Sequence, residues 1–215
     1  MAAMITQDGA QSKFEGTLEY VETRWRDADR ATLRHAFGML ARGRAVTADC
    51  LAERAGVSVA AAGAAMRSAP VGLDAGGALN ELFGVMLTPT LHRVEIEGRA
   101  IFTCCAAVAH TMPSLVDRPV TVESVDPVSR RLVTLRLSPD SIEDLDPSTA
   151  VACCAATPVN PEPADVREAF CCHLKHFADR NSAQEFAALN ERRQVIPVAE
   201  MHALAHELVS RIWSA

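Results

Sequence analysis

The sequence predicts an α+β fold, in which an N-terminal helical, helix-turn-helix-like module packs on a mixed core of antiparallel strands and helices. Apolar residues recur at helical spacing within 18–70, and short runs of alternating apolar and polar residues follow within 71–155. A further amphipathic segment covers 195–213. We therefore assign residues 1–80 to the N-terminal module and 81–215 to the α+β core.

The composition is that of a globular protein with enough apolar surface for a core. Apolar residues make up 49% and charged residues 22% of the 215 residues. The formal net charge of −6 weighs against a nucleic-acid partner, because such proteins usually present a basic face to phosphate. The apolar runs are too short to cross a bilayer, and the polar first residues lack the pattern of a secretory signal. We expect a cytoplasmic protein that neither binds DNA nor enters a membrane.

Cysteine is the residue type that most needs an explanation. Three adjacent pairs occur, Cys104 with Cys105, Cys153 with Cys154 and Cys171 with Cys172, and Cys50 stands apart. In a reducing compartment these side chains are expected to be free thiols, metal ligands or catalytic groups, not disulfides. Adjacent cysteines do not readily pair with each other, and none of the pairs has the CxxC spacing of a structural zinc site. Each pair therefore needs partners from elsewhere in the chain.

The N-terminal module shows clear helix signals. Asp29 is placed to cap a helix that opens near Arg30, and the apolar stripe of that helix consists of Leu33, Phe37, Leu40 and Ala41. Thr47, the turn at Gly56 and Ser58 delimit two further helices in a helix-turn-helix pattern. The expected apolar contacts of this pattern are Leu51, Ala55 and Val57.

The second helix of this pattern has little with which to read a base edge. It offers alanine, glycine and a single arginine, Arg67. We therefore expect the helix-turn-helix to be a packing element.

Alternating segments predict two hairpins in the core. The first covers 92–103 with a turn at Gly98, and the second covers 118–139 around the turn at 126–130. Cys104 and Cys105 directly follow the first hairpin, and a helix or tight turn after them should stop at Met112–Pro113.

The last cysteine pairs fall in two different kinds of segment. A buried strand over 149–158 holds Cys153 and Cys154, and alternation sends their side chains to opposite faces. One continuous helix is expected over 163–189, capped by Asp165. It would carry His173 and His176 on one face, and the final helix would carry His202 and His206 on a solvated or half-buried face.

Several of these motifs together resemble the organomercurial (alkylmercury) lyase family. They are the helix-turn-helix, the hairpin that ends in thiols, "PSL" at 113–115, "LSP" at 137–139 and "ADVREAFCCHLKHFA" at 164–178. The likeness is strongest across 101–179, and the N-terminal module fits the non-DNA-binding helical domain of that family. The resemblance implies capture of R–Hg⁺ by two thiolates, followed by protonation of the departing carbon.

The resemblance also implies which residues act. Cys105 and Cys171 correspond to the two attacking thiolates, and both would bind the metal. The aspartate of the family should lie three residues after the first cysteine, where this chain has Val108. The candidate replacements as proton donor or auxiliary group are Asp126, His110 and His173, together with the Cys105 thiol itself. The position of Cys104 is one where the family typically has a bulky aromatic residue.

Thiolate chemistry supports this interpretation, because soft cations such as mercury prefer sulfur ligands. Additional candidate metal ligands are Cys104, Cys154 and Cys172. The alternative for each thiol is simple packing as a small buried apolar side chain.

We interpret the chain as a lyase-like enzyme that cleaves a carbon–metal bond without a cofactor. Its substrate would be a small organometallic compound, and low-molecular-weight thiols or a metal reductase would accept the metal. The first alternative is a relative that binds a soft metal (mercury or copper), or a lyase with an altered substrate, that has lost standard protonolysis because Val108 replaces the acid. The second is a thiol-responsive transcriptional regulator.

Overall fold

The computed structural model describes residues 14–155 and 169–213, and it has the predicted α+β fold. The N-terminal helices are α2 (Glu15–Trp25), α3 (Arg30–Leu40), α4 (Ala48–Ala55) and α5 (Val59–Arg67). The core contains α6 (Ala106–Val116), the short 3-10 helix η1 (Cys171–His173), α8 (Arg180–Ala188) and α9 (Val198–Trp213). No helix in these described ranges is both long and apolar enough to cross a bilayer.

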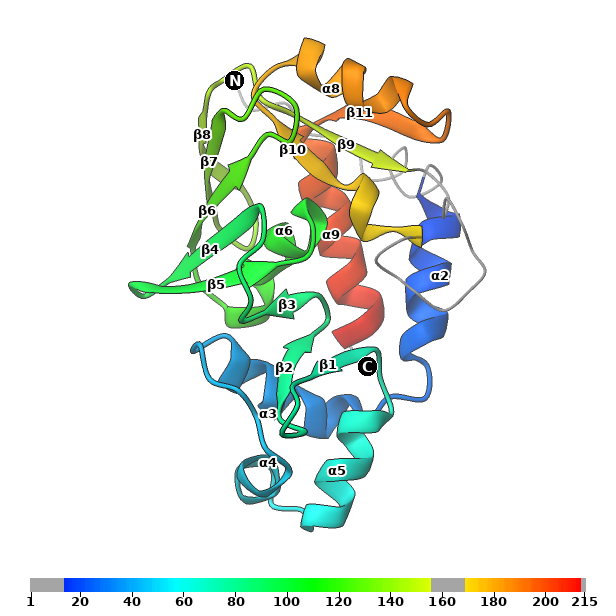
Figure 1. Cartoon of the computed structure of the whole chain (residues 1–215), viewed down its shortest axis with the longest axis vertical. Coiled ribbons are helices and arrows are strands. Elements are labelled where there is room, and N and C mark those ends of the chain that lie inside the picture. Colours follow the sequence, from blue (N-terminus) through cyan, green and yellow to red (C-terminus); the bar gives the residue numbers. More distant parts are fainter. Residues whose placement is uncertain (1–13, 156–168, 214–215) are drawn as a thin grey trace.

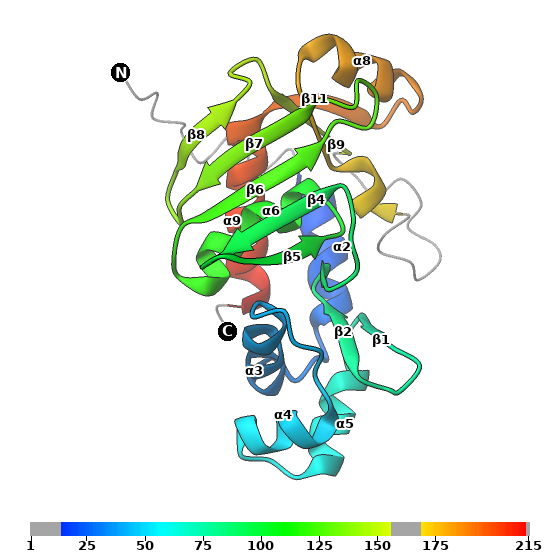
Figure 2. The same cartoon turned by 60° about the vertical axis from the view of Figure 1, so that its left-hand side comes forward.

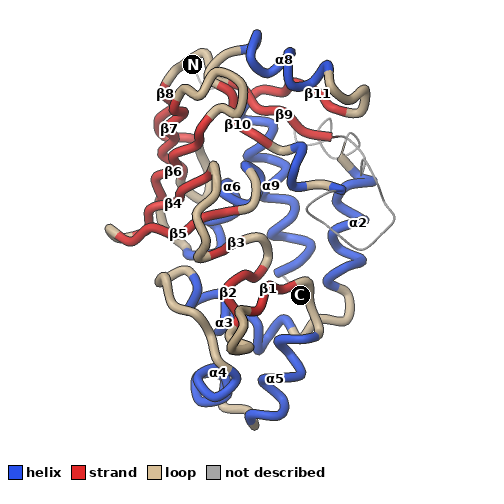
Figure 3. Tube along the Cα trace, in the orientation of Figure 1, coloured by secondary structure: helices blue, strands red, loops and turns tan. Residues whose placement is uncertain are grey.

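Two antiparallel sheets carry the strands (Figure 3). The larger has the order β1-β2-β3-β5-β4-β6-β7-β8. Its strands are β1 (Val71–Leu73), β2 (Leu79–Leu82), β3 (Val85–Met86), β4 (His92–Ile96), β5 (Arg99–Thr103), β6 (Val120–Val125), β7 (Leu132–Leu137) and β8 (Ile142–Asp146). The smaller has the order β10-β9-β11, with β9 (Val151–Ala155), β10 (Lys175–Phe177) and β11 (Arg193–Pro197).

A layer of two helices separates the sheets. Helix α6 packs on β4, β5 and β6, and α9 packs on α6 and on the smaller sheet at β9 and β11. Figure 2 shows α9 running behind the larger sheet, and both views place α3, α4 and α5 at one end of the molecule. Helix α6 also contacts β10, and η1 contacts β9, so the start of α6 and the η1–β10 segment lie close together.

The N-terminal predictions are confirmed in most details. The Asp29 side chain accepts the Thr32 N–H, and the Thr47 and Ser58 side chains cap α4 and α5. Gly56 ends α4 in the left-handed conformation, with φ of 69°. The predicted stripe of α3 is buried.

One apolar contact of the helix-turn-helix was predicted wrongly. Leu51 is fully buried, but the Val57 side chain is exposed because it lies in the turn between α4 and α5.

Aromatic side chains join the N-terminal helices to the core. The ring of Phe83, in the β2–β3 turn, contacts Trp25 from α2 and Trp213 from α9, with centroid distances of 5.4 and 5.8 Å. The predicted boundary at residue 80 stays a prediction. β2 crosses that position and pairs with β1 on one side and β3 on the other.

The two predicted hairpins are present. Strands β4 and β5 pair around a turn in which Glu97 and Gly98 have φ of 51° and 76°. Strands β6 and β7 pair from Val120 opposite Leu137 to Val125 opposite Leu132.

Two helix predictions were wrong. Helix α6 continues through Pro113 to Val116, because burial of its first two turns against the larger sheet and α9 outweighs the hydrogen bond that proline cannot donate.

The continuous helix expected over 163–189 is divided into η1, β10 and α8. Lys175, His176 and Phe177 pair with β9 as a strand, so strand pairing overrides the local helical pattern. His173 and His176 thus do not share a helix. Helix α8 has its own cap, the Asp179 side chain. The predicted cap Asp165 lies outside the described residues.

Candidate active site

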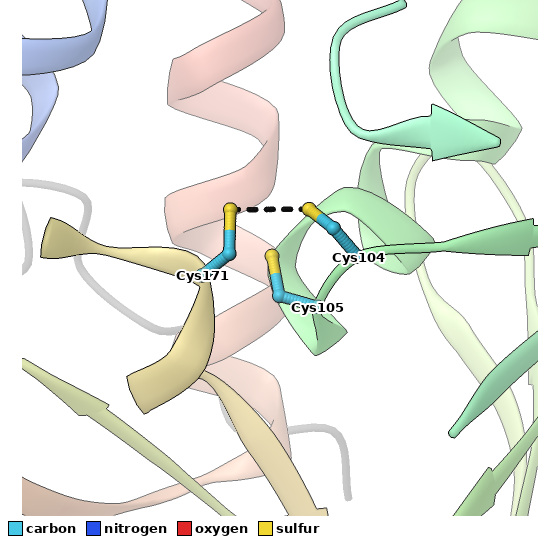
Figure 4. A group of neighbouring side chains, drawn as sticks. All are labelled: Cys104, Cys105 and Cys171. Carbon is cyan, nitrogen blue, oxygen red and sulfur yellow. Dashed lines mark hydrogen bonds between the residues drawn. The ribbon is translucent and has the colours of Figure 1, made fainter. Parts of the chain in front are cut away.

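Three sulfur atoms converge at one point between the sheets. The Sγ atoms of Cys104, Cys105 and Cys171 all lie within 4.8 Å of one another. Cys104 Sγ donates to Cys171 Sγ across 3.1 Å, although these residues are 67 positions apart in sequence. Figure 4 shows the three side chains pointing toward one another from two separate segments. Three ligand atoms at this spacing are able to hold one soft metal ion.

Backbone hydrogen bonds fix the first two thiols at the junction of β5 and α6. The Cys104 N–H donates to the Gly84 carbonyl across 2.8 Å, and the Thr103 hydroxyl donates to the Cys105 carbonyl across 3.0 Å. Cys105 is the N-cap residue of α6 and has extended backbone. A thiolate is favoured there, because the first N–H groups of a helix point toward it.

The third thiol comes from η1, which one hydrogen bond ties to the start of α6. The Ala106 N–H donates to the Leu174 carbonyl across 3.0 Å. This bond aligns the two segments, so that Cys171 faces Cys104 and Cys105. The next residue, Cys172, is exposed.

The three thiols are not electrostatically equivalent. Burial raises the pKa of Cys105, but hydrogen bonds from Cys104 and Cys171, the Val108 backbone N–H and the Lys175 charge together hold this pKa well below its usual value. The hydrogen bond to Cys105 and burial raise the pKa of Cys104 well above its usual value.

The pKa of Cys171 is shifted in the same direction as that of Cys104. The hydrogen bond from Cys104 lowers the pKa of Cys171, but the hydrogen bond to Cys105 and burial outweigh it, and the pKa is raised. Of the three thiols, Cys105 is therefore the one that ionises most readily.

Lys175 is a member of the site that the sequence did not reveal. It is the first residue of β10, and its ammonium group donates to the Cys104 carbonyl across 3.4 Å. Its charge lowers the pKa of both Cys105 and Cys171. The available signal was a basic residue four positions after Cys171, a spacing that would put both side chains on one face of the predicted helix.

Val108 lies beside the sulfur cluster. A Cβ atom placed on Gly84 would stand 2.5 Å from Cys104 Sγ and 3.0 Å from Val108 Cγ2, so both side chains pack under the same glycine turn. Gly84 has φ of 71°, a conformation that suits glycine. The side chain next to Cys104 at this point is thus an apolar one that carries no proton.

Comparison with known proteins decides the family. A family model described as alkylmercury lyase matches residues 86–210. The chain belongs to the alkylmercury lyase family. An alkylmercury lyase of Staphylococcus epidermidis is 32% identical over 174 residues, which cover 80% of this chain and 79% of that protein. An alkylmercury lyase of Bacillus cereus is 29% identical over 175 residues, which cover 80% and 78%.

A structural comparison agrees with this membership at the level of the fold. A crystal structure of the mercury-bound form of MerB2 matches with a TM-score of 0.75. The match covers 92% of this chain and 99% of that one, with 13% sequence identity. The family resemblance carried by the cysteine motifs is therefore confirmed.

Asp126, one of the candidate proton donors, is a structural carboxylate. It accepts the N–H groups of Val128, Ser129 and Ala178 and the Ser129 hydroxyl, at 2.7 to 3.0 Å. Burial raises its pKa, but these hydrogen bonds outweigh the burial and lower it. The structure uses Asp126 to tie the β6–β7 turn to the end of β10, and an ionised carboxylate is a poor proton donor.

The two candidate histidines have other hydrogen-bond partners. His173 Nδ1 accepts from Arg193 Nε across 3.0 Å. His110 is buried on α6, and its two ring nitrogens meet His202 and His176. His176, which the sequence placed on a helix face, instead lies in the core at β10.

The remaining candidate ligands do not join the three sulfurs. Cys153 packs in a small cluster with Phe177 and Ala183, and burial raises its pKa to about 11. Cys154 belongs to the main core, on the opposite face of β9. Among the described residues, the group of converging thiols contains neither of them, and it does not contain Cys172.

Proposed function

We propose that this member of the alkylmercury lyase family cleaves the carbon–mercury bond of small organomercurials. The convergence of Cys104, Cys105 and Cys171 supports this most directly, because it brings three sulfur ligands within reach of one metal atom. The setting is a compartment rich in small thiols, such as the cytoplasm, where the substrate arrives as the adduct R–Hg–SR′.

Capture begins at Cys105. Its thiolate attacks mercury, the bond from mercury to the small thiol breaks, and R′S⁻ leaves. The product is R–Hg–S–Cys105. The positive charge of Lys175 favours this step, because it stabilises the attacking thiolate in a buried position.

Cleavage needs a proton, and the two neutral thiols carry it. As a second sulfur binds mercury, its S–H proton passes to the carbon, and the electron pair of the C–Hg bond becomes the new C–H bond. The hydrocarbon RH leaves, and mercury stays in its divalent state between two sulfurs. Cys104 and Cys171, 3.1 Å apart, share this task. The thiols thus supply the proton that Val108 is unable to give.

The metal then leaves by thiol exchange. Two small thiolates displace the protein sulfurs, and mercury leaves as the complex Hg(SR′)₂, which a metal reductase can accept. The protein supplies orientation and charge, and the chemistry rests on sulfur alone.

Turnover of phenylmercury with excess small thiol tests the proposal. We expect continuous release of benzene, and loss of this release in Cys105→Ala and Cys171→Ala. The matched control is Cys50→Ala, because Cys50 lies in α4 outside the thiol cluster. Absence of benzene from the reduced wild-type protein would overturn the proposal.

The position of Val108 beside the sulfurs favours one second function. A site without a carboxylic acid could bind a soft metal, mercury or copper, and not cleave the C–Hg bond. Stoichiometric retention of intact phenylmercury, with no benzene, would identify that function.

A further inference from the structure

A chain of buried hydrogen bonds runs through the core next to the thiol cluster. It begins at His92 on β4, whose Nδ1 lies 2.8 Å from the Ser124 hydroxyl on β6. The same hydroxyl lies 2.8 Å from His176 Nδ1 on β10. His92, Ser124 and His176 are fully buried.

The chain continues across the helix layer. His176 Nε2 lies 3.0 Å from His110 Nε2 on α6, and His110 Nδ1 lies 3.2 Å from His202 Nδ1 on α9. Five elements thus contribute one group each to an unbranched line. The outer atoms, His92 Nε2 and His202 Nε2, are buried and have no hydrogen-bond partner among the described residues.

The rings in this line are neutral. Burial lowers the pKa of His92 and His110 well below the usual value, and it lowers the pKa of His176 and His202 to about 4. A neutral imidazole has one N–H donor and one acceptor nitrogen. Every hydrogen bond in the line must therefore point the same way.

Two such orientations exist, and they differ by one shift of each proton along the line. In the first orientation, His176 donates to His110 and His110 donates to His202. In the second, both bonds are reversed. Passing from one orientation to the other moves one proton from end to end without leaving a charge inside the core, which makes the line a proton wire.

The thiol cluster needs such a supply. Each turnover removes one proton from the cluster as RH, and the small thiols that extract mercury attack as thiolates, so they bring no proton. Cys104 is partly exposed, but Cys105 and Cys171 are buried, which limits direct exchange of these two thiols with water. One proton must therefore enter the core before the next cleavage.

The line is placed to deliver this proton. His176 follows Lys175 on β10, and the Lys175 ammonium group donates to the Cys104 carbonyl across 3.4 Å. At the other end, His202 is half-buried on α9, one turn before the exposed His206. The line thus lies between α9, whose next turn carries an exposed histidine, and the strand that carries Lys175.

We propose that His202, His110 and His176 form a proton relay that refills the thiol cluster after each turnover, with Ser124 and His92 as its inner continuation. This inference rests on the proposed lyase function. No hydrogen bond joins a described ring to one of the three sulfurs, so the last transfer requires a rotation of the His176 ring or one intervening water. These histidines act through the thiols and do not touch the substrate.

The test compares the first turnover with later ones. In His110→Gln, the amide preserves hydrogen bonds but does not pass a proton along. We expect the first equivalent of benzene to appear at the wild-type rate, because its proton already sits on a thiol. Later turnovers should slow by about 100-fold, the usual scale of lost proton transfer. The matched control is His35→Gln, on the exposed face of α3. It should keep the wild-type rates of both the first and the later turnovers.

The outcomes separate the two proposals. No benzene from the wild type means that the lyase function fails. An active wild type with unchanged later turnovers in His110→Gln overturns the relay. If His110→Gln slows the first and the later turnovers equally, the histidines have a merely structural role, and the relay is also overturned.

A measurement on the wild type covers the case in which His110→Gln does not fold. The ¹⁵N spectrum of the imidazole rings should show averaged Nδ1 and Nε2 signals for His110 and His176, because the two orientations exchange. Fixed, separate signals for each nitrogen would mean a static network and would contradict the relay.

Discussion

Cys104 Sγ lies 3.1 Å from Cys171 Sγ, and the pKa of both thiols is raised above the usual value. Their contact places two S–H groups next to the Cys105 sulfur. In the proposed mechanism, the proton source and the metal ligands are the same kind of group. That mechanism gives Cys104, where an aromatic residue was expected, a direct part in the chemistry.

Replacement of Cys104 tests that part. In Cys104→Ala we expect phenylmercury to bind stoichiometrically through Cys105, while benzene release falls by about 100-fold because one proton donor is lost. Rapid-quench measurement of benzene, beside mercury binding, separates the two steps. The exposed neighbour of Cys171 provides the control, since Cys172→Ala should leave both quantities unchanged. Wild-type turnover in Cys104→Ala would remove Cys104 from the mechanism.

A carboxylic acid at position 108 should help cleavage. Val108 packs beside Cys104 under Gly84, so Val108→Asp would bring an acid to the sulfurs. We expect methylmercury turnover to rise by about tenfold, on the scale of added general acid catalysis. Val108→Asn is the control of equal size without an acidic proton. An equal effect of both variants would show that proton supply does not limit the reaction.

Gly84→Ala should damage both stability and activity. The left-handed backbone alone costs about 1–2 kcal/mol for alanine. The added Cβ would meet Cys104 Sγ at 2.5 Å, and such overpacking costs a further ~1–3 kcal/mol. Gly98→Ala isolates the backbone cost, because Gly98 has φ of 76° and no atom within 4 Å of a new Cβ. Chemical denaturation should rank Gly84→Ala as the less stable variant. Equal stability would mean that the turn adapts around Cys104.

Lowering the pH should reduce the free energy of unfolding, because it protonates Cys105. The pKa of this thiol is lowered in the folded state. Its thiolate therefore contributes stability that is fully present above the ordinary thiol pKa and is lost as the pH falls through the lowered folded value. We expect the unfolding free energies of wild type and Cys105→Ala to converge as the pH falls. A difference that does not change with pH would contradict a thiolate at this position.

Lys175 should help to set that thiolate. Without its charge, as in Lys175→Met, the pKa of Cys105 should rise, so alkylation by iodoacetamide at neutral pH should slow. Lys175→Arg keeps the charge and should preserve more of the rate. The pH dependence of Cys105 alkylation, followed by peptide mass spectrometry, gives this comparison. Identical profiles for wild type and Lys175→Met would rule out the electrostatic role.

The sequence predicted the parts of this fold that depend on local signals. Caps such as Asp29 and Thr47, and the turn at Gly98, involve residues a few positions apart, and these predictions are confirmed. The prediction of one continuous helix over 163–189 was wrong, because β10 forms only by pairing with β9. The continuation of α6 past Pro113 was missed for a related reason, since its burial between a sheet and α9 is a property of the whole fold.

Prediction of the site from the sequence was limited in the same way. The motifs around Cys105 and Cys171 pointed to thiol chemistry, and Cys104 was named from the sequence as an additional candidate ligand. The place of Lys175 and the line of histidines depend on packing. His92, His176 and His202 lie on three different elements, and no spacing in the sequence relates them. Their meeting is visible only once the two sheets are placed around α6 and α9.

Mercury L-edge X-ray absorption of the reduced protein after addition of one equivalent of phenylmercury tests the central claim most directly. We expect a first shell of sulfur atoms from two or three cysteines and no carbon, together with free benzene. A shell that retains one carbon beside a single sulfur would show capture without cleavage and would contradict the proposed lyase.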